Sequence, residues 1–166
     1  MNKDPSLHFA HQSTKTYGHN VGLSATFRQW RATSHCNKLH GYALAVKLVF
    51  KSTTLDSRNW VVDFGALKPI KQRLEDMFDH KTLVARDDPE LAAFEALNDK
   101  GLIDLRILPK TGCEGFSEYI GVMVNDWLMV SYLAGLRQAQ IVPPEYLHCA
   151  EVEVSEHGAN SASWFY

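Results

Sequence analysis

The sequence predicts an α+β domain in which a four-stranded antiparallel sheet carries helices packed on one face. Two patterns predict this class. Three strand-like segments follow one another early in the chain, and the helical segments are grouped between them and a last strand. Strands that follow one another without a helix between them pair antiparallel, and grouped helices then cover one face of the sheet.

The strands are predicted from the alternation of apolar and polar residues, because side chains two positions apart share a face. The expected strands cover residues 21–27, 40–50, 59–62 and 150–156. In the second strand His40 is in phase with Tyr42 and the apolar residues that follow. In the last strand Glu156 is in phase with Val152 and Val154, which places a carboxylate on the apolar face.

The helices are predicted where apolar residues recur every three or four positions. The expected helices cover residues 67–78, 89–97 and 114–133. Pro69 is compatible with the first turn of the first helix, where no intrahelical N–H is needed. Glu114 opens the third helix, and an acid there suits the positive end of the helix dipole.

The composition indicates one domain and excludes several classes of protein. The chain has 166 residues, of which 45% are hydrophobic and 22% charged, with 17 basic and 19 acidic residues. This near-neutral balance argues against a nucleic-acid partner or an anionic membrane surface. No apolar run reaches the roughly 18 residues of a membrane span, and no signal-peptide pattern opens the chain. We expect residues 1–20 to form an N-terminal arm and residues 21–166 the domain.

Three cysteines, widely spaced, suit the reduced thiols of a cytoplasmic protein rather than a disulfide framework. Cys36 could act as a nucleophile, a metal ligand or an inert loop thiol. Asp79 and His80 follow the first helix and could form a general base with its orienting carboxylate, or could cap the helix. Glu156 could bind a ligand or emerge at the sheet rim.

Taken together, the order of six short segments resembles the 6-pyruvoyl-tetrahydropterin synthase / 6-carboxytetrahydropterin synthase family. The resemblance covers roughly residues 21–158. The segments are Leu23-Ser24-Ala25, Cys36-Asn37-Lys38-Leu39-His40-Gly41-Tyr42, Val62-Asp63-Phe64-Gly65-Ala66-Leu67-Lys68, Asp79-His80-Lys81-Thr82-Leu83, Thr111-Gly112-Cys113-Glu114 and Val152-Glu153-Val154-Ser155-Glu156.

This resemblance implies a tunnelling fold, in which trimers close a β-barrel, two trimers stack as a hexamer and active sites lie between subunits. It implies catalytic roles for Cys36, Asp79 and His80, and pterin binding by Glu156 and Glu114. A thiolate is a competent base or nucleophile when a histidine or a positive field lowers its pKa. A carboxylate can accept two parallel hydrogen bonds from the aminopyrimidine edge of a pterin.

The resemblance breaks at the zinc site. The family binds zinc through three histidines, and the corresponding positions here hold Phe27, His40 and Tyr42. Three explanations are open: the metal is lost, a nearby histidine such as His35 substitutes, or Tyr42 makes a weak contact. We favour a divergent enzyme with a weakened or altered zinc site. His19 lies eight residues before Phe27, about 26 Å along an extended strand, which makes it a poor substitute.

The sequence therefore predicts a pterin-processing lyase, most simply a 6-carboxytetrahydropterin synthase that converts dihydroneopterin triphosphate on the route to 7-deazaguanine nucleosides such as queuosine. Its expected partners are a small-molecule pterin and further copies of the chain in a trimer or hexamer. The alternatives are a non-catalytic pterin- or purine-binding oligomer and a dihydroneopterin aldolase-like activity. The connection between His80 and Thr111 is longer than is usual in the family, and its helix is expected to reshape the rim of the pocket.

Overall fold

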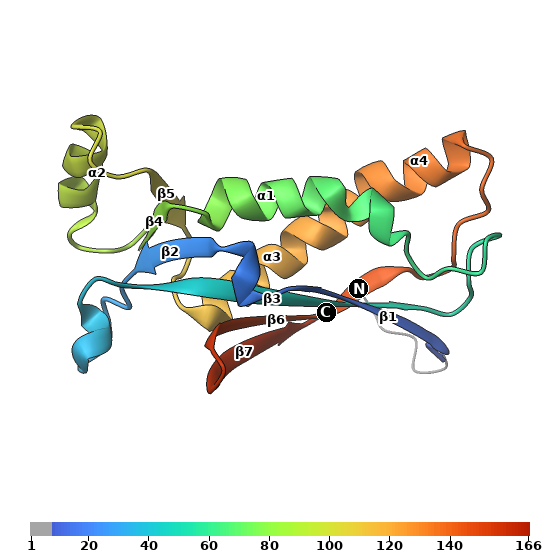
Figure 1. Cartoon of the computed structure of the whole chain (residues 1–166), viewed down its shortest axis with the longest axis horizontal. Coiled ribbons are helices and arrows are strands. Elements are labelled where there is room, and N and C mark those ends of the chain that lie inside the picture. The colour runs from blue at the N-terminus through green and yellow to red at the C-terminus, as the bar shows by residue number, and fades with distance from the viewer. Residues whose placement is uncertain (1–7) are drawn as a thin grey trace.

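The computed structural model describes residues 8–166, and the first seven residues of the expected N-terminal arm lie outside this range. Figure 1 shows one curved sheet with the long helices on one side of it. The elements are β1 (His11–Tyr17), β2 (Leu23–Phe27), β3 (His40–Ser52), α1 (Lys68–Phe78), β4 (Lys81–Ala85), α2 (Leu91–Asp99), β5 (Leu105–Leu108), α3 (Cys113–Trp127), α4 (Leu133–Gln138), β6 (His148–His157) and β7 (Asn160–Phe165).

The sheet has the strand order β5-β4-β2-β3-β6-β7, and β1 joins it by pairing with β3. The long strand β3 organises it, because β2 pairs with residues 40–44 and β1 with residues 46–52 on the same edge, while β6 occupies the other edge. All of these pairs are antiparallel. The predicted α+β class with helices on one face is therefore confirmed.

The sheet is larger and less uniform than predicted. Seven strands are present in residues 8–166 where four were expected, and β4 pairs parallel with β2 and with β5. The expected purely antiparallel sheet is wrong at this end. β4 runs parallel to β2 because β3 carries the chain back along the sheet and α1 then returns it in the direction of β2. α2 lies in the crossover connection between the parallel strands β4 and β5.

Residues 59–62 form a loop instead of the predicted strand. Asp56 organises this loop, since its side chain accepts hydrogen bonds from the backbone N–H groups of Arg58 and Trp60. Asn59 adopts a left-handed conformation with φ 68°, which is incompatible with a strand. Val61 is nevertheless buried, which explains why its neighbourhood resembles a strand in the sequence.

The expected arm is partly a strand. β1 pairs with β3 from His11 to Tyr17, and the Tyr17 ring is buried with its hydroxyl donating to the backbone oxygen of Leu67 at 3.4 Å. Residues 11–20 therefore belong to the domain. Burial raises the pKa of Tyr17 to about 12, because the phenolate would be poorly solvated there.

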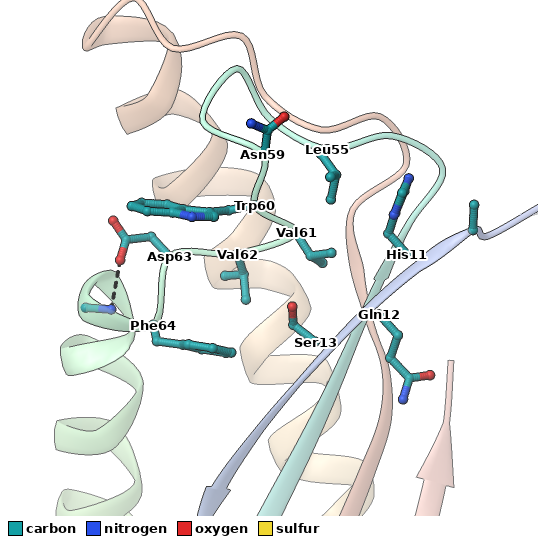
Figure 2. Close-up of a pocket in the computed structure, with 12 residues that line it drawn as sticks. His11, Gln12, Ser13, Leu55, Asn59, Trp60, Val61, Val62, Asp63 and Phe64 are labelled. Atoms are coloured by element: carbon teal, nitrogen blue, oxygen red, sulfur yellow. Dashed lines mark hydrogen bonds between the residues drawn. The ribbon is translucent and has the colours of Figure 1, made fainter.

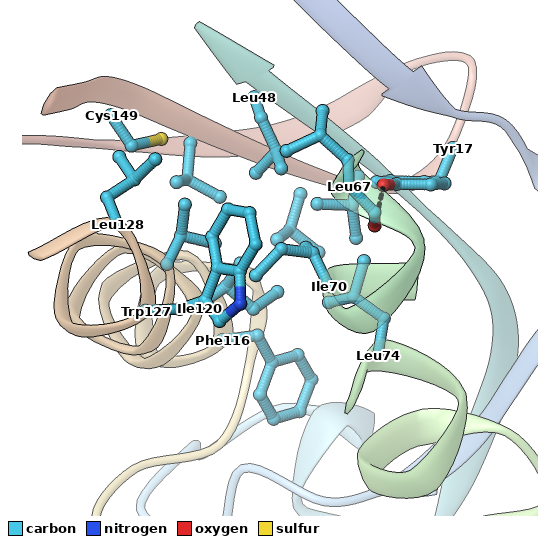
Figure 3. Packing of buried hydrophobic residues seen from close by; sticks show 14 of the residues in the cluster. Tyr17, Leu48, Leu67, Ile70, Leu74, Phe116, Ile120, Trp127, Leu128 and Cys149 are labelled. Atoms are coloured by element: carbon cyan, nitrogen blue, oxygen red, sulfur yellow. Dashed lines mark hydrogen bonds between the residues drawn. The ribbon is translucent and has the colours of Figure 1, made fainter. Parts of the chain in front are cut away.

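The core lies between the sheet and the helices α1 and α3. Figure 3 shows the apolar side chains of both helices meeting those of β3 beneath the sheet. The buried contributors from the helices include Ile70, Leu74, Phe78, Phe116, Ile120 and Val124. The third predicted helix is present, but it continues through a π-helical turn, Leu128–Tyr132, into α4. Leu133 and Leu136 of α4 are buried and pack this additional part of the helix against the core.

In the described part of the chain, the continuous helix Cys113–Gln138 is long and apolar enough to cross a membrane by length and composition alone. Its apolar side instead packs against the sheet through residues such as Phe116, Ile120 and Leu128, none of which is exposed. We therefore interpret it as the core helix of the domain.

Candidate functional site

Three aromatic rings meet where β2 ends and β3 begins. Phe27 is the last residue of β2 and pairs in register with His40, the first residue of β3. The Phe27 and His40 ring centres are 4.9 Å apart, those of His40 and Tyr42 5.7 Å, and those of Phe27 and Tyr42 6.2 Å. We call Phe27, His40 and Tyr42 the ring cluster. Its members occupy the three positions that the sequence resemblance matches to zinc ligands of the family, and His40 is the one histidine among them.

The ring cluster is bounded by α3 and by the end of β6. The Phe116 ring stands edge-on to the Phe27 ring at 5.0 Å, and Phe27 has no exposed surface. On the other side, the His157 ring lies 5.8 Å from the Tyr42 ring. Sequence reasoning missed His157, although its position directly after Glu156 could have suggested it.

Glu156 lies beside the start of α3. It is half-buried and lies at the point where the register between β6 and β7 shifts, between Ser155 and His157. Burial, together with the negative charges of Glu156 and Glu114, raises the pKa of the Cys113 thiol to about 12. Cys113 is the first residue of α3, so both carboxylates surround the N-terminus of that helix, although Glu114 itself is exposed.

Cys36 lies in the connection between β2 and β3. It is the middle residue of a short 3₁₀ turn, His35–Asn37, and is half-buried. The Ser34 hydroxyl oxygen accepts a hydrogen bond from the Cys36 backbone N–H at 3.4 Å. The thiol is therefore held on an ordered turn beyond the end of the sheet.

Asp79 and His80 form a hydrogen-bonded pair between α1 and β4. His80 Nδ1 lies 2.7 Å from Asp79 Oδ1, and the His80 side chain is 84% exposed. His80 has φ 56°, in the left-handed region, which turns the chain sharply from helix to strand. It lines a cavity of about 480 Å³ with Ser24, Thr26 and Leu102 among others. The expected long connection thus supplies part of this rim.

Within one chain, Cys36 and His80 are far apart. His80 comes one residue before the position that pairs with Ala25 in the parallel β2–β4 ladder. Cys36 lies past the other end of β2, where its carbonyl oxygen accepts a hydrogen bond from the Gln29 N–H at 2.9 Å. His80 thus lies at the height of Ser24 and Cys36 at the height of Gln29, and these two positions are about 16 Å apart along the direction of β2. A single chain does not bring the predicted catalytic residues together.

The side chains of the ring cluster do not fit a zinc ion. Protein zinc sites use Cys, His, Asp or Glu, usually with at least three such ligands. Phe27 has no donor atom, and Tyr42 offers only a phenol. Residues 8–166 contain no group of three or more of these ligand types arranged to hold a metal, so His35 does not complete a site with His40.

The Val-Asp-Phe-Gly segment has a structural role. Asp63 Oδ1 accepts a hydrogen bond from the Gly65 N–H at 2.8 Å and so begins the turn that leads into α1. A cavity of about 640 Å³ opens beside this segment and β1. Figure 2 shows Trp60 and Phe64 on either side of Asp63, with the Phe64 ring directed toward Ser13 of β1. None of the predicted site residues lines this cavity.

Comparison with known proteins agrees with this arrangement. The family model described as 6-pyruvoyl tetrahydropterin synthase matches residues 16–165. The chain therefore belongs to the 6-pyruvoyl tetrahydropterin synthase family, which confirms the resemblance seen in its sequence.

Two curated relatives, from Rickettsia felis and Rickettsia conorii, are each named 6-carboxy-5,6,7,8-tetrahydropterin synthase. Each is 30% identical to this chain over 57 residues, a segment that covers 34% of this chain and 41% of the relative. The matched segment thus spans less than half the length of these relatives.

Solved structures share the fold. An uncharacterized protein from Wolinella succinogenes superposes with a TM-score of 0.73 at 16% identity, covering 93% of this chain and 97% of its own. A 6-pyruvoyltetrahydropterin synthase from Plasmodium vivax, substituted at a catalytic residue, gives 0.60 at 16% identity over 94% and 98%. The enzyme from Plasmodium falciparum gives 0.59 at 16% identity over 93% and 98%. The tunnelling fold predicted for this chain is confirmed.

Proposed function

We propose that the chain is a pterin-processing lyase that converts 7,8-dihydroneopterin triphosphate to 6-carboxy-5,6,7,8-tetrahydropterin, with loss of triphosphate and acetaldehyde. The observation that carries this proposal is the half-buried Glu156 beside the first turn of α3, one residue before His157, whose ring packs against Tyr42 of the ring cluster. A carboxylate at a helix start, bordered by aromatic rings, suits a flat heterocycle with a hydrogen-bond donating edge. A role in 7-deazaguanine biosynthesis in the cytoplasm would follow.

Glu156 would accept the two hydrogen bonds of the aminopyrimidine edge and fix the pterin in the site. Glu114 would contribute to pterin binding at the N-terminus of the same helix, α3. His40 is held by a contact of 2.7 Å between its Nδ1 and the Lys38 backbone oxygen. If Nδ1 carries the proton in this bond, Nε2 is left to accept a hydrogen bond or a proton from the substrate side chain.

Cys36 would abstract a proton from the substrate side chain or attack it as a thiolate, and the Asp79–His80 pair would carry protons. The carboxylate of Asp79 can hold the His80 imidazole in one tautomer, as its hydrogen bond to Nδ1 indicates. Because these groups are about 16 Å apart along β2 within one chain, they would meet only between subunits. We therefore propose a homo-oligomer, a trimer or hexamer, with shared sites.

Product analysis tests the activity. The purified protein is incubated with dihydroneopterin triphosphate, and the pterins and the aldehyde are identified by mass spectrometry. We expect 6-carboxytetrahydropterin and acetaldehyde. Binding without turnover would instead support a non-catalytic pterin-binding oligomer, and cleavage of dihydroneopterin would support an aldolase-like activity.

Matched variants test the residue roles. Cys36→Ala and His80→Asn should each lower kcat by about 10²-fold or more, whereas Thr33→Ala, an exposed change near Cys36, should not. Glu156→Gln should mainly raise KM. Full activity of Cys36→Ala would contradict its assigned role.

Complementation tests the shared site. Refolding Cys36→Ala with His80→Asn in equal amounts should restore about a quarter of wild-type activity, because random mixing leaves that share of sites with both intact groups. Activity no higher than that of either variant would argue that each chain forms its own site.

A further inference from the structure

The spacing of the ring cluster matches that of three imidazoles around one zinc ion. Zinc–nitrogen bonds of about 2.0–2.1 Å in tetrahedral geometry place the centres of three ligating rings about 5 Å apart. The ring centres of Phe27, His40 and Tyr42 are 4.9, 5.7 and 6.2 Å apart. The three side chains therefore lie at separations similar to those that a shared zinc ion would require, although only one of them is an imidazole.

His40 keeps the orientation of a metal ligand. Its Nδ1 lies 2.7 Å from the Lys38 backbone oxygen. Histidine ligands commonly make such a hydrogen bond with the nitrogen that does not bind metal, which fixes the ring and leaves the other nitrogen available. One ligand and its support are thus in place.

Phe27 replaces a donor with apolar surface. Its side chain is fully buried and packs edge-on against Phe116, at 5.0 Å between ring centres. A cation next to this wall would lose water and gain no ligand from it, which is unfavourable. Phe27 therefore provides no zinc ligand, and its apolar ring makes the binding of a cation beside it energetically unfavourable.

The neighbouring His157 does not compensate. Its Nδ1 accepts a hydrogen bond from the Ala159 N–H at 3.2 Å, which leaves the proton of the neutral ring on Nε2, 3.3 Å from the side-chain nitrogen of Asn160. Nδ1 is therefore engaged in the turn between β6 and β7, and Nε2 carries no free lone pair for a metal. His157 packs against Tyr42 as a ring and adds no third ligand in the part of the chain that the structure describes.

We propose that this chain has abandoned zinc at the ring cluster through its side chains alone, and that the backbone still forms the zinc site. A ligand in this centre meets the phenol of Tyr42 and the imidazole of His40 in place of a metal. Restoring two donor side chains, at Phe27 and Tyr42, is then sufficient to create zinc binding. The inference concerns the free protein and does not depend on the proposed reaction.

Zinc content of the free protein tests this inference. Wild type and the double variant F27H/Y42H are loaded with zinc, dialysed and measured by elemental analysis and thermal unfolding. We expect wild type to retain less than about 0.1 zinc per chain, and F27H/Y42H to retain about one and to unfold several degrees higher with zinc than after chelation. Wild type should show no such shift.

A third substitution is the matched control. Adding His40→Ala to the double variant leaves the two new imidazoles and removes the native one, so retained zinc should fall at least tenfold. Zinc that persists in the triple variant would mean that the metal binds elsewhere, and would overturn the assignment of the site.

Two further outcomes would overturn the proposal. One is stoichiometric zinc in wild type that His40→Ala removes, and the other is a folded double variant that binds none. If the double variant does not fold, Tyr42→His alone retains the packing of Phe27. Two imidazoles on one strand face should bind zinc at least tenfold more tightly than wild type, and equal affinity would refute the inference.

Discussion

The two faces of β2 illustrate different constraints on a functional site. On the face toward the helices, Ala25 and Phe27 are buried, and Phe27 packs against α3. On the other face, Ser24 and Thr26 line a cavity together with the exposed His80. A side chain on the packed face is constrained by the packing of the core, which limits its use in binding or catalysis. On the open face the polar side chains of Ser24, Thr26 and His80 can contact a ligand or another subunit. Phe27 lies on the packed face, and its ring is part of the core.

The largest effect should come from the packed face. Phe27→Ala should lower the free energy of unfolding by about 3–5 kcal/mol, because it removes a fully buried ring and leaves a cavity. Thr26→Ala, one residue earlier on the open face, should cost less than about 1 kcal/mol. Urea unfolding measures both, and equal losses would show that the two faces do not differ as described.

The second-largest loss of stability should come from the ion pair that joins the end of β2 to the segment before α2. Arg28 makes two hydrogen bonds to Asp88, Nε to Oδ2 at 2.8 Å and Nη2 to Oδ1 at 2.6 Å. The Asp88 side chain has no exposed surface, and that of Arg28 is 20% exposed. Removing one partner leaves the other charge desolvated. Asp88→Ala should therefore cost about 2–3 kcal/mol, less than for a fully buried pair because water still reaches Arg28.

The adjacent pair provides the control. Arg31 also pairs with Asp87, but both side chains are more than half exposed. Water solvates these charges whether or not they pair, so Asp87→Ala should leave the urea midpoint nearly unchanged. A loss equal to that of Asp88→Ala would contradict the distinction between buried and exposed pairs.

The third prediction distinguishes the thiols by pH. Burial raises the pKa values of Cys113 and Cys149 to about 12 each. Above the ordinary thiol pKa the unfolded chain releases protons that the folded chain retains, so the free energy of unfolding falls as pH rises from about 9. The slope is at most about 1.4 kcal/mol per pH unit for each thiol. Urea unfolding at pH 7, 8, 9 and 10 measures it.

Cys149→Ala is the control for this slope, since it should remove about half of the loss between pH 9 and 10. A thiol reagent at pH 8 should modify Cys36 in the folded protein and reach the two buried thiols only after unfolding. Three rapidly reacting thiols would contradict the burial of Cys113 and Cys149.

The elements with strong apolar periodicity were predictable. The periodicity of α1 and α3 and the alternation in β3 place these elements within a few residues of their observed bounds. β1 was missed because its residues, HQSTKTY, are almost all polar and it forms only by pairing with β3. β4 is buried along most of its length and has no alternation to reveal it.

The candidate site was predictable only in part. Motif order identified Cys36, His40, Asp79, His80, Glu114 and Glu156 as candidates, and their roles remain predictions. The proximity of Glu156 to Cys113, and of His157 to Tyr42, joins β6 to α3 and to β3. Such contacts depend on how distant elements pack, which spacing along the chain does not specify.

The sequence by itself determined the fold class and the family resemblance, and it has Phe27 and Tyr42 at positions where the resemblance implies histidines, because these follow from residue types and their order. Only the tertiary structure decided that Phe27 is fully buried, that the three rings of the ring cluster lie side by side, and that Cys36 and His80 lie apart within a chain. Strand periodicity determines which side chains share a face. Distances between faces, and the water that each residue loses, depend on strand register and on the helices that cover the sheet.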